Sequence, residues 1–180
     1  MDEQSRWIRS IQTSGDRVSA DALVRAWYDE ILRYVRRQTP DTWVALDLTQ
    51  EIFISMLRTI GSYDRRRAGF RTWLYAIATN KVIDWYRSRA ARVLDVADLE
   101  GHDPVLADPT DDWVQGVSSG EAVQRLLGVL PGAAQKIVRL HVFGEQTFAE
   151  IAKGMSMSEN TAKTTYYRAL RRLRKEIDDE

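Results

Sequence analysis

The sequence predicts an all-α protein in which two small helical domains are joined by a flexible acidic linker, with a helix-turn-helix in the C-terminal domain. Apolar residues recur at three- and four-residue spacing over most of the chain, as they do in amphipathic helices. Strand signals are absent, since no Asn-Gly or Asp-Gly turn lies between alternating apolar runs. The linker is expected at residues 94–120, which are rich in proline, glycine, serine and acidic side chains.

Length and composition favour a soluble protein. The chain has 180 residues and no cysteine, so it has neither disulfides nor a thiolate metal site. No apolar run approaches the roughly 20 residues that a membrane-spanning helix needs. The mixed, charged residues 1–12 do not resemble a secretory signal. We therefore expect a cytoplasmic protein with no membrane insertion.

The formal net charge of zero conceals an uneven distribution. Residues 1–92 hold 16 basic and 11 acidic side chains, residues 93–124 hold 8 acidic and no basic ones, and residues 125–180 hold 10 basic and 7 acidic ones. Charges are screened beyond about 10 Å at ordinary salt, so each block presents its own sign to a partner. Two mildly basic blocks therefore flank an acidic connector. A connector with no function beyond tethering the blocks would have the same composition.

Three helices are expected in the N-terminal domain, residues 1–93. They cover residues 19–38, 47–60 and 70–94. Ser19 or Asp21 is the expected cap of the first helix, and Asp47 lies at the expected start of the second. The expected core consists of Leu23, Trp27, Ile31, Tyr34, Val35, Leu48, Ile52, Phe53, Met56, Leu57, Ile60, Trp73, Leu74, Ile77, Ala78, Ile83 and Tyr86.

Two features of this domain exceed what folding needs. The segment DLTQE and its continuation place Asp47, Gln50, Glu51 and Ile54 on one helical side, although a solvated face with Asp47 as a cap would look the same. The basic loop that follows, residues 63–69, leads into an aromatic-rich helix. Cations interleaved with rings suit single-stranded nucleic acid, because bases stack on the rings while the cations follow the backbone. Most of these rings are expected in the core, and Tyr63 is the best candidate for a surface ring.

The C-terminal domain, residues 121–180, contains the predicted helix-turn-helix. Pro131 suits the start of a helix whose expected core is Leu130, Ile137, Val138 and Leu140. A short helix over residues 148–153 then precedes a longer one that Ser158 caps. The longer helix is expected to bury Ala162, Tyr166, Ala169, Leu170 and Leu173, and to expose Asn160, Lys163, Thr164, Tyr167, Arg168, Arg171 and Arg172.

These exposed residues are arranged as in a helix-turn-helix. The start of its second helix contacts bases in the major groove, and basic residues farther along bind phosphates. An ordinary amphipathic hairpin with a solvated basic face is the alternative. Ser156 occupies the turn position at which glycine is usual, because the backbone φ there is positive.

Catalysis finds no support in the sequence. The motifs HExxH and GxSxG and a glycine-rich phosphate loop are all missing, and the two histidines, His102 and His141, stand alone. Asp47 and Glu51 lie one turn apart, without a third ligand at a useful spacing. We therefore expect no enzyme activity, no metal and no cofactor.

The segments DLTQEIFISMLRTIGSYD, FRTWLYAIATNKVIDWYRSR and LPGAAQKIVRLHVFGEQTFAEIAKGMSMSENTAKTTYYRALRRLR occur in this order with a linker before the last. Together they resemble the extracytoplasmic-function group of bacterial RNA polymerase sigma factors over nearly the whole chain. The resemblance implies an alternative sigma factor that binds core RNA polymerase, directs it to specific promoters and helps to open them.

The resemblance also implies residue roles. Core polymerase, through the clamp helices of its beta-prime subunit, would be bound by Asp47, Gln50, Glu51 and Ile54, and its beta flap is a further implied partner. The minus-ten element, as double-stranded and then single-stranded promoter DNA, would be bound by Tyr63, Asp64, Arg65, Arg66, Arg67, Arg71, Asn80, Lys81, Asp84 and Arg87. The minus-thirty-five element would be bound by Asn160, Lys163, Thr164, Thr165, Tyr167, Arg168 and Arg171.

The resemblance further implies that the acidic linker threads the polymerase channel and that an anti-sigma factor is a possible partner. The recognition helix departs from the family pattern at Asn160, Ala162, Thr165 and Tyr167, so we expect an unusual minus-thirty-five preference. Two other classes remain open. One is a helix-turn-helix regulator that binds DNA without polymerase, and the other is a protein-interaction adaptor built from two helical bundles.

Overall fold

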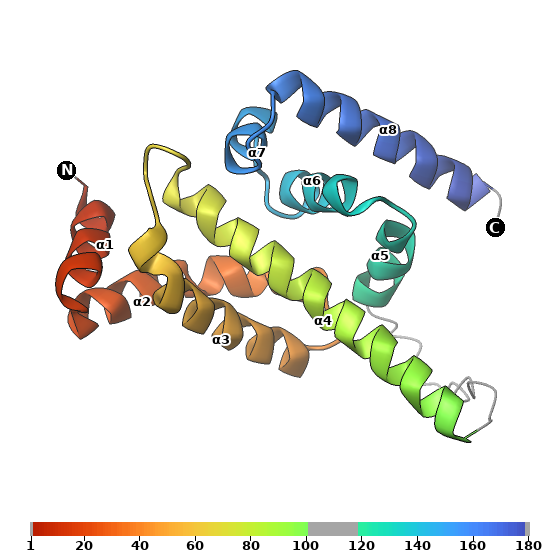
Figure 1. Cartoon of the computed structure of the whole chain (residues 1–180), viewed down its shortest axis with the longest axis horizontal. Coiled ribbons are helices and arrows are strands. Elements are labelled where there is room, and N and C mark those ends of the chain that lie inside the picture. The colour runs from red at the N-terminus through yellow and green to blue at the C-terminus, as the bar shows by residue number, and fades with distance from the viewer. Residues whose placement is uncertain (1, 101–118, 179–180) are drawn as a thin grey trace.

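A computed structural model describes residues 2–100 and 119–178 of the chain. Every regular element in this described part is helical, as predicted. The elements are α1 (Glu3–Ser14), α2 (Arg17–Arg36), α3 (Thr42–Thr59), the short 3-10 turn η1 (Ile60–Ser62), α4 (Phe70–Glu100), α5 (Ser119–Gly128), α6 (Gly132–Val142), α7 (Phe148–Gly154) and α8 (Glu159–Asp178). Figure 1 shows α1 to α3 along one side of the long helix α4, and α5 to α8 along the other.

The N-terminal helices begin earlier than the sequence predicted. The Asp16 carboxylate accepts hydrogen bonds from the backbone N–H groups of Val18 and Ser19, so Asp16 caps α2 in place of Ser19 or Asp21. Asp41 caps α3 in the same way by accepting from the N–H of Val44. Asp47 therefore lies inside α3, which excludes the capping role that its expected position at the helix start suggested.

Helix α1 was not among the helices predicted from the sequence. Its N-cap is Asp2, and it packs against α2 and η1. The Gln4 side chain accepts a hydrogen bond from the Trp27 indole at 3.0 Å. At the other end, the Gln12 amide donates to the carbonyl oxygens of Ile60 (2.8 Å) and Tyr63 (3.0 Å). Helix α1 thus ties α2 to the start of the basic loop.

The N-terminal core contains most of the residues that the helical period selected. The buried set includes Leu23, Ile31, Tyr34, Val35, Leu48, Ile52, Phe53, Met56, Ile60, Leu74, Ala78, Ile83 and Tyr86. Trp27, Trp73 and Ile77 pack against this core while partly buried. Leu57 differs from the prediction, since 36% of its surface is exposed.

Helix α4 continues to Glu100, past Leu94 where the linker was expected to begin. Helix α5 begins at Ser119. The rest of the predicted linker, residues 101–118, lies outside the described residues.

The C-terminal helices form the predicted helix-turn-helix from α7 and α8. Thr147 and Glu150 make a reciprocal capping box at the start of α7. Ser158 accepts a hydrogen bond from the N–H of Thr161 at 3.0 Å at the start of α8. In the turn, Ser156 adopts φ of 55°, so the chain keeps the usual left-handed turn without glycine. Of the predicted α8 core, Ala162 and Ala169 are buried, whereas Leu170 is 37% exposed.

The two halves of the chain pack directly on each other. Helix α4 contacts both α6 and α7, and Figure 1 shows these helices lying against one side of α4. Ile137, Leu140 and Ile151 of the C-terminal half belong to the same apolar cluster as Leu74 and Tyr75 of α4. A second, smaller cluster around Leu127, Leu130 and Ala169 holds α5, α6 and α8 together.

Candidate functional site

One solvent-facing stripe on α3 carries all four residues of the predicted polymerase-binding surface. Asp47, Gln50, Glu51 and Ile54 are each exposed, and their spacing places them on one side of the helix. Their apolar neighbours Leu48, Ile52 and Phe53 are buried on the opposite side. The helix is therefore anchored by one face and presents two carboxylates, an amide and an apolar side chain on the other.

Trp43 extends this stripe by one turn, and sequence reasoning missed it. It lies four residues before Asp47 on the same side of α3, and 81% of its surface is exposed. An indole this exposed is unusual, because most tryptophan surface in folded proteins is covered. Trp43 was not selected because the helix was predicted to begin at Asp47, four residues later.

The basic loop, residues 63–69, is held by its aromatic and acidic members. Tyr63 is half-buried, contrary to the expectation of a surface ring. It packs edge-on to Phe70 at 5.6 Å and lies 5.1 Å from Trp73, while its hydroxyl donates to the carbonyl of Ala68. Burial raises the pKa of Tyr63. Asp64 accepts from the backbone N–H and the guanidinium of Arg66, and these hydrogen bonds lower the pKa of its carboxyl.

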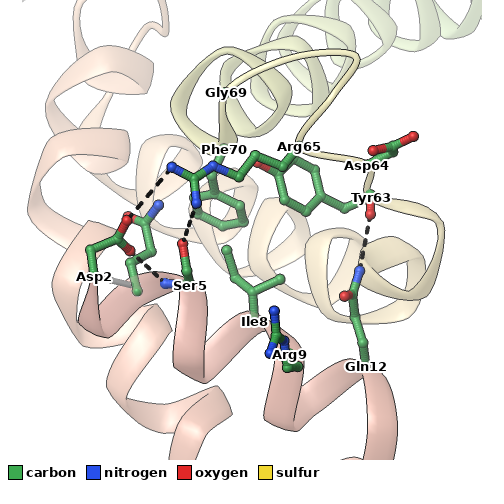
Figure 2. Close-up of a pocket in the computed structure, with 11 residues that line it drawn as sticks. Asp2, Ser5, Ile8, Arg9, Gln12, Tyr63, Asp64, Arg65, Gly69 and Phe70 are labelled. Carbon is green, nitrogen blue, oxygen red and sulfur yellow. Dashed lines mark hydrogen bonds and ion pairs between the residues drawn. The ribbon is translucent and has the colours of Figure 1, made fainter.

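A cavity of about 430 Å³ opens between α1 and this loop. Figure 2 shows Arg65 reaching from the loop across the cavity toward Asp2 and Ser5 of α1. Its guanidinium donates to the Ser5 hydroxyl at 3.2 Å and lies 3.9 Å from the Asp2 carboxylate. The walls combine the apolar Ile8 and Phe70 with the polar residues Asp2, Gln4, Ser5, Arg9, Gln12, Tyr63, Asp64 and Arg65. Helix α1 therefore supplies about half of the lining of this polar cavity, and none of its residues was among the predicted minus-ten contacts.

The α4 residues of the predicted minus-ten surface fall into two groups. Asn80, Asp84 and Arg87 are exposed, and Lys81 is half-buried beside them. Arg71, at the start of the helix, is instead engaged: it donates to the Glu30 carboxylate at 3.0 Å and to the carbonyl of Gly144 at 2.9 Å. Partial burial works to lower the pKa of Arg71, but Glu30 and Tyr75 together outweigh it and the pKa is raised.

The predicted minus-thirty-five residues lie together on the outer face of α8. Asn160, Lys163, Thr164, Tyr167, Arg168 and Arg171 are exposed, whereas Thr165 is half-buried at the edge of this face. Behind it, the Tyr166 ring packs edge-on against His141 of α6 at 4.8 Å and Phe148 of α7 at 5.3 Å. Ala162 is fully buried, which lets α8 approach α7 closely. Helix α8 is thus fixed by one side and presents donors and cations on the other.

The fold brings the proposed polymerase and minus-ten surfaces next to each other. Lys81 on α4 lies 3.0 Å from the Glu51 carboxylate on α3. The α8 face belongs to the other half of the chain, and Figure 1 shows α8 separated from α3 by α4 and by α6 and α7. Among the described residues, no helix is both long and apolar enough to cross a bilayer.

Known proteins share both the sequence and the fold. Residues 23–92 match the family Sigma-70 region 2, and residues 120–173 match the family Sigma-70, region 4. The chain is 31% identical over 162 residues to the RNA polymerase sigma factor YlaC of Bacillus subtilis. The aligned residues make up 89% of this chain and 93% of that protein. It is 29% identical over 173 residues to the ECF RNA polymerase sigma factor SigW of the same organism, with 92% of each chain covered.

A solved structure has the same fold. CnrH, determined in complex with the cytosolic domain of CnrY, superposes with a TM-score of 0.60 over 99% of both chains at 21% identity. The region 2 match runs from within α2 into α4, and the region 4 match runs from α5 into α8, so all three predicted surfaces lie on matched segments. The chain belongs to the extracytoplasmic-function group of bacterial RNA polymerase sigma factors.

Proposed function

We propose that three surfaces of this chain divide the work of a promoter-specificity factor. The α3 stripe binds core RNA polymerase, the 63–69 loop with α4 binds and opens the minus-ten element, and the outer face of α8 reads the minus-thirty-five element. Residues 1–93 then form the polymerase and minus-ten unit, and residues 121–180 form the minus-thirty-five unit. Because polymerase and promoter are its partners, the protein acts in the cytoplasm and needs no chemistry of its own.

The α3 stripe supports the polymerase role by its composition. Among the described residues, the Asp47 and Glu51 carboxylates have no contact that stabilises the fold apart from the ion pair of Glu51 with Lys81. Ile54 and Trp43 add apolar surface, since Ile54 is 48% exposed and Trp43 is 81% exposed. Apolar side chains flanked by charges are typical of a protein–protein contact in which the apolar part supplies affinity and the charges supply orientation.

The cavity beside the loop supports the minus-ten role. Removing a base from the stack costs a few kcal/mol, and stacking on a ring returns about 1–3 kcal/mol per base. The half-buried Tyr63 lines the cavity with polar groups around it, whereas Phe70, which also lines it, is only 3% exposed. Arg66 and Arg67 are exposed on the loop and can follow the phosphates. Such a cavity suits a single unstacked base of the displaced strand.

The outer face of α8 supports the minus-thirty-five role. Asn160, Lys163 and Thr164 lie in its first turns, where a recognition helix contacts base edges, and Arg168 and Arg171 follow where phosphates are held. The capping by Ser158 and the packing of Tyr166 fix the helix before DNA arrives. The observation that carries the whole proposal is the exposed α3 stripe beside the loop and α4, because a regulator that acted without polymerase would not need it.

In vitro transcription with purified core polymerase and a promoter library tests the proposal. We expect this chain to redirect initiation to a new set of start sites, and the chain and core enzyme to co-elute in gel filtration. Promoter binding by the chain alone, with no change when core polymerase is added, would instead favour the polymerase-independent regulator. Loss of all DNA binding in both conditions would favour the adaptor. An anti-sigma factor is a further proposed partner, and co-purification from the native host tests for it.

A further inference from the structure

We infer that helix α1 is a further DNA-binding element, which contacts the displaced strand of the opened promoter through the cavity that it shares with the 63–69 loop. A base of that strand lies in the cavity, and the phosphate beside it binds Arg9 of α1. This inference rests on the proposed minus-ten role of the loop. It extends that role to a helix outside the matched region 2 segment, which begins at residue 23.

Helix α1 presents one side to the cavity. Four of its lining residues recur at three- and four-residue spacing along the helix and its N-cap, namely Asp2, Ser5, Arg9 and Gln12. Ile8 also lines the cavity and is only 6% exposed, so it ties this side of α1 to the core. Figure 2 shows these α1 side chains facing the loop residues across the cavity.

The size and the walls of the cavity suit a nucleobase. Its volume of about 430 Å³ lies within the roughly 300–1,000 Å³ of pockets that bind small ligands. Ile8 and Phe70 supply apolar surface for a flat ring, and the Ser5 hydroxyl and the Gln4 amide supply hydrogen-bonding groups for its edge. Gln4 accepts from the Trp27 indole through its oxygen, so its amide N–H groups are available to a ligand.

Arg9 is a cation of this cavity that the fold does not use. It is exposed and lines the cavity. Among the described residues, no carboxylate lies within ion-pair distance of its guanidinium and no acceptor takes a hydrogen bond from it. A guanidinium binds a phosphate through two parallel hydrogen bonds, which an unpaired arginine can form without breaking an existing contact.

The other charges of the lining have partners within the protein. The Asp64 carboxylate accepts from the backbone N–H and the guanidinium of Arg66 on the same loop. The Asp2 carboxylate lies 3.9 Å from the guanidinium of Arg65, so these two opposite charges offset each other. The charge of Arg9 therefore remains for a ligand, and it favours an anion at the α1 side of the cavity.

A DNA strand fits this arrangement because the cavity continues into the basic loop. Tyr63, Asp64 and Arg65 belong both to the cavity lining and to the loop. Arg66 and Arg67 follow directly along the chain and are exposed. A strand with one base in the cavity can place one phosphate against α1 and the next phosphates against the loop, as rings and cations do when they bind single strands.

Contacts within the protein fix α1 relative to the loop before DNA arrives. The Gln12 amide donates to the carbonyls of Ile60 and Tyr63 at 2.8 Å and 3.0 Å, just before the basic residues of the loop. Arg9 lies between the buried Ile8 and this anchor at Gln12, so its backbone position is set. Preorganised groups lose less conformational entropy when they bind, which makes a single cation effective.

The salt dependence of strand binding tests the role of Arg9. We would assemble holoenzyme from core polymerase and this chain and titrate it against a pre-opened promoter at a series of salt concentrations. Arg9→Ala should weaken binding and reduce the slope of log K against log salt by about 0.7, the value for one phosphate of a single strand. Arg9→Lys keeps the charge and should keep the slope. Arg6→Ala is the matched control, because Arg6 is exposed on the same helix but does not line the cavity.

Replacing the bases of the displaced strand one at a time by abasic sugars locates the occupant of the cavity. We expect one position in the minus-ten element at which the abasic strand binds wild-type holoenzyme more weakly. At that position the effect of Arg9→Ala should shrink, because the base no longer holds the neighbouring phosphate against α1, and elsewhere it should persist. An Arg9→Ala effect that is the same at every position would exclude a base in this cavity.

Arg66→Ala on the loop separates this inference from the proposed function. If Arg66→Ala weakens strand binding while Arg9→Ala behaves like Arg6→Ala, the loop binds the strand without α1, and the inference is wrong while the proposed function stands. If Arg66→Ala and Arg9→Ala both leave strand binding unchanged, the proposed minus-ten role fails together with the inference. Circular dichroism checks that each variant keeps its helices.

Discussion

The Lys81 ammonium on α4 lies 3.0 Å from the Glu51 carboxylate on α3, and it thereby joins the proposed minus-ten surface to the proposed polymerase surface. Both side chains are partly exposed, so the pair contributes little to stability, of the order of 0–1 kcal/mol. The ion pair couples the two proposed surfaces, because a polymerase group that binds Glu51 would compete with Lys81 and free the Lys81 ammonium to bind DNA.

Glu51→Lys should weaken binding to core polymerase by about tenfold or more while the helix content stays unchanged. A charge-swapped control, Glu51→Lys combined with Lys81→Glu, restores an ion pair but not the carboxylate on α3. We expect this double variant to remain weak in a fluorescence-anisotropy titration with core enzyme. Recovery of wild-type affinity by the swap would assign the effect to the intramolecular pair and remove Glu51 from the polymerase contact.

Trp43→Ala should lower the affinity for core polymerase by about tenfold, or about 1.4 kcal/mol, since exposed tryptophans often dominate the binding energy of an interface. The thermal midpoint should hardly change, because the ring is 81% exposed. Val18→Ala on α2 is the matched control, as it removes another exposed apolar side chain, 79% exposed, outside the α3 stripe. Equal affinities for the two variants would exclude Trp43 from the interface.

Arg168→Ala should reduce affinity for promoters that carry the minus-thirty-five element. If Arg168 contacts a phosphate, the slope of log K against log salt should fall by about 1, and all sequences should be affected alike. Arg125→Ala removes an exposed cation of α5 and should leave this slope unchanged. A footprint over the minus-thirty-five element that Arg168→Ala does not alter would count against the assignment.

Ser156→Gly should stabilise the helix-turn-helix. Ser156 holds φ at 55°, which costs a residue with a Cβ atom about 1–2 kcal/mol. Glycine offsets about 0.5–1 kcal/mol of this, because it loses more backbone entropy when the chain folds, so the net gain lies between about 0 and 1.5 kcal/mol. A gain of about 1 kcal/mol corresponds to a rise in the unfolding midpoint of roughly 2–4 °C. Ser156→Ala keeps the Cβ atom and should show no rise, and a rise of equal size would place the effect elsewhere.

Stability should fall in alkaline solution as buried tyrosines ionise. Burial raises the pKa of Tyr86 from 10.0 to about 12, and its hydroxyl donates to the carbonyl of Gln38 at 2.7 Å. Because the folded pKa lies above the unfolded value, this contribution is complete below pH 10 and is lost as the pH rises toward 12. Burial also raises the pKa values of Tyr34 and Tyr75, so they act in the same direction.

Tyr86→Phe should therefore make the free energy of unfolding less dependent on pH between 10 and 12, as measured by urea titration at a series of pH values. Tyr167→Phe, on the exposed face of α8, is the control and should keep the wild-type dependence. An unchanged slope for Tyr86→Phe would show that ionisation of Tyr86 does not contribute to the alkaline loss.

The helical period of apolar side chains was enough to predict the fold class, the α7–α8 pair and most of the core. It was less reliable at helix ends, where a single side chain decides. Asp16 and Asp41 start α2 and α3 earlier than the apolar pattern suggested, because an N-cap depends on one hydrogen bond rather than on periodicity. Because α3 begins at Thr42, Asp47 lies inside the helix and does not cap it, and Trp43 lies on the same helical face as Asp47.

Helix α1 shows a different limit of sequence reasoning. Its apolar residues are few, although Ile8 is buried in the core, and polar contacts such as that of Gln12 with the carbonyls of Ile60 and Tyr63 add to its docking. A contact between residues so far apart in sequence leaves no local pattern. The cavity between α1 and the loop was therefore invisible before the fold was known, although most of its loop residues had been selected.

The sequence by itself determined which faces of the helices are buried and which carry carboxylates, cations and hydrogen-bond donors, because that information is local and repeats every turn. Only the tertiary structure decided how the two halves meet. The contact of Arg139 with Gln38 joins positions that are 101 residues apart, and the close approach of Gly120 to Thr39 depends on the placement of whole helices. Such contacts form only when packing brings distant helices together, because the interaction energy depends on both partners and neither segment contains both.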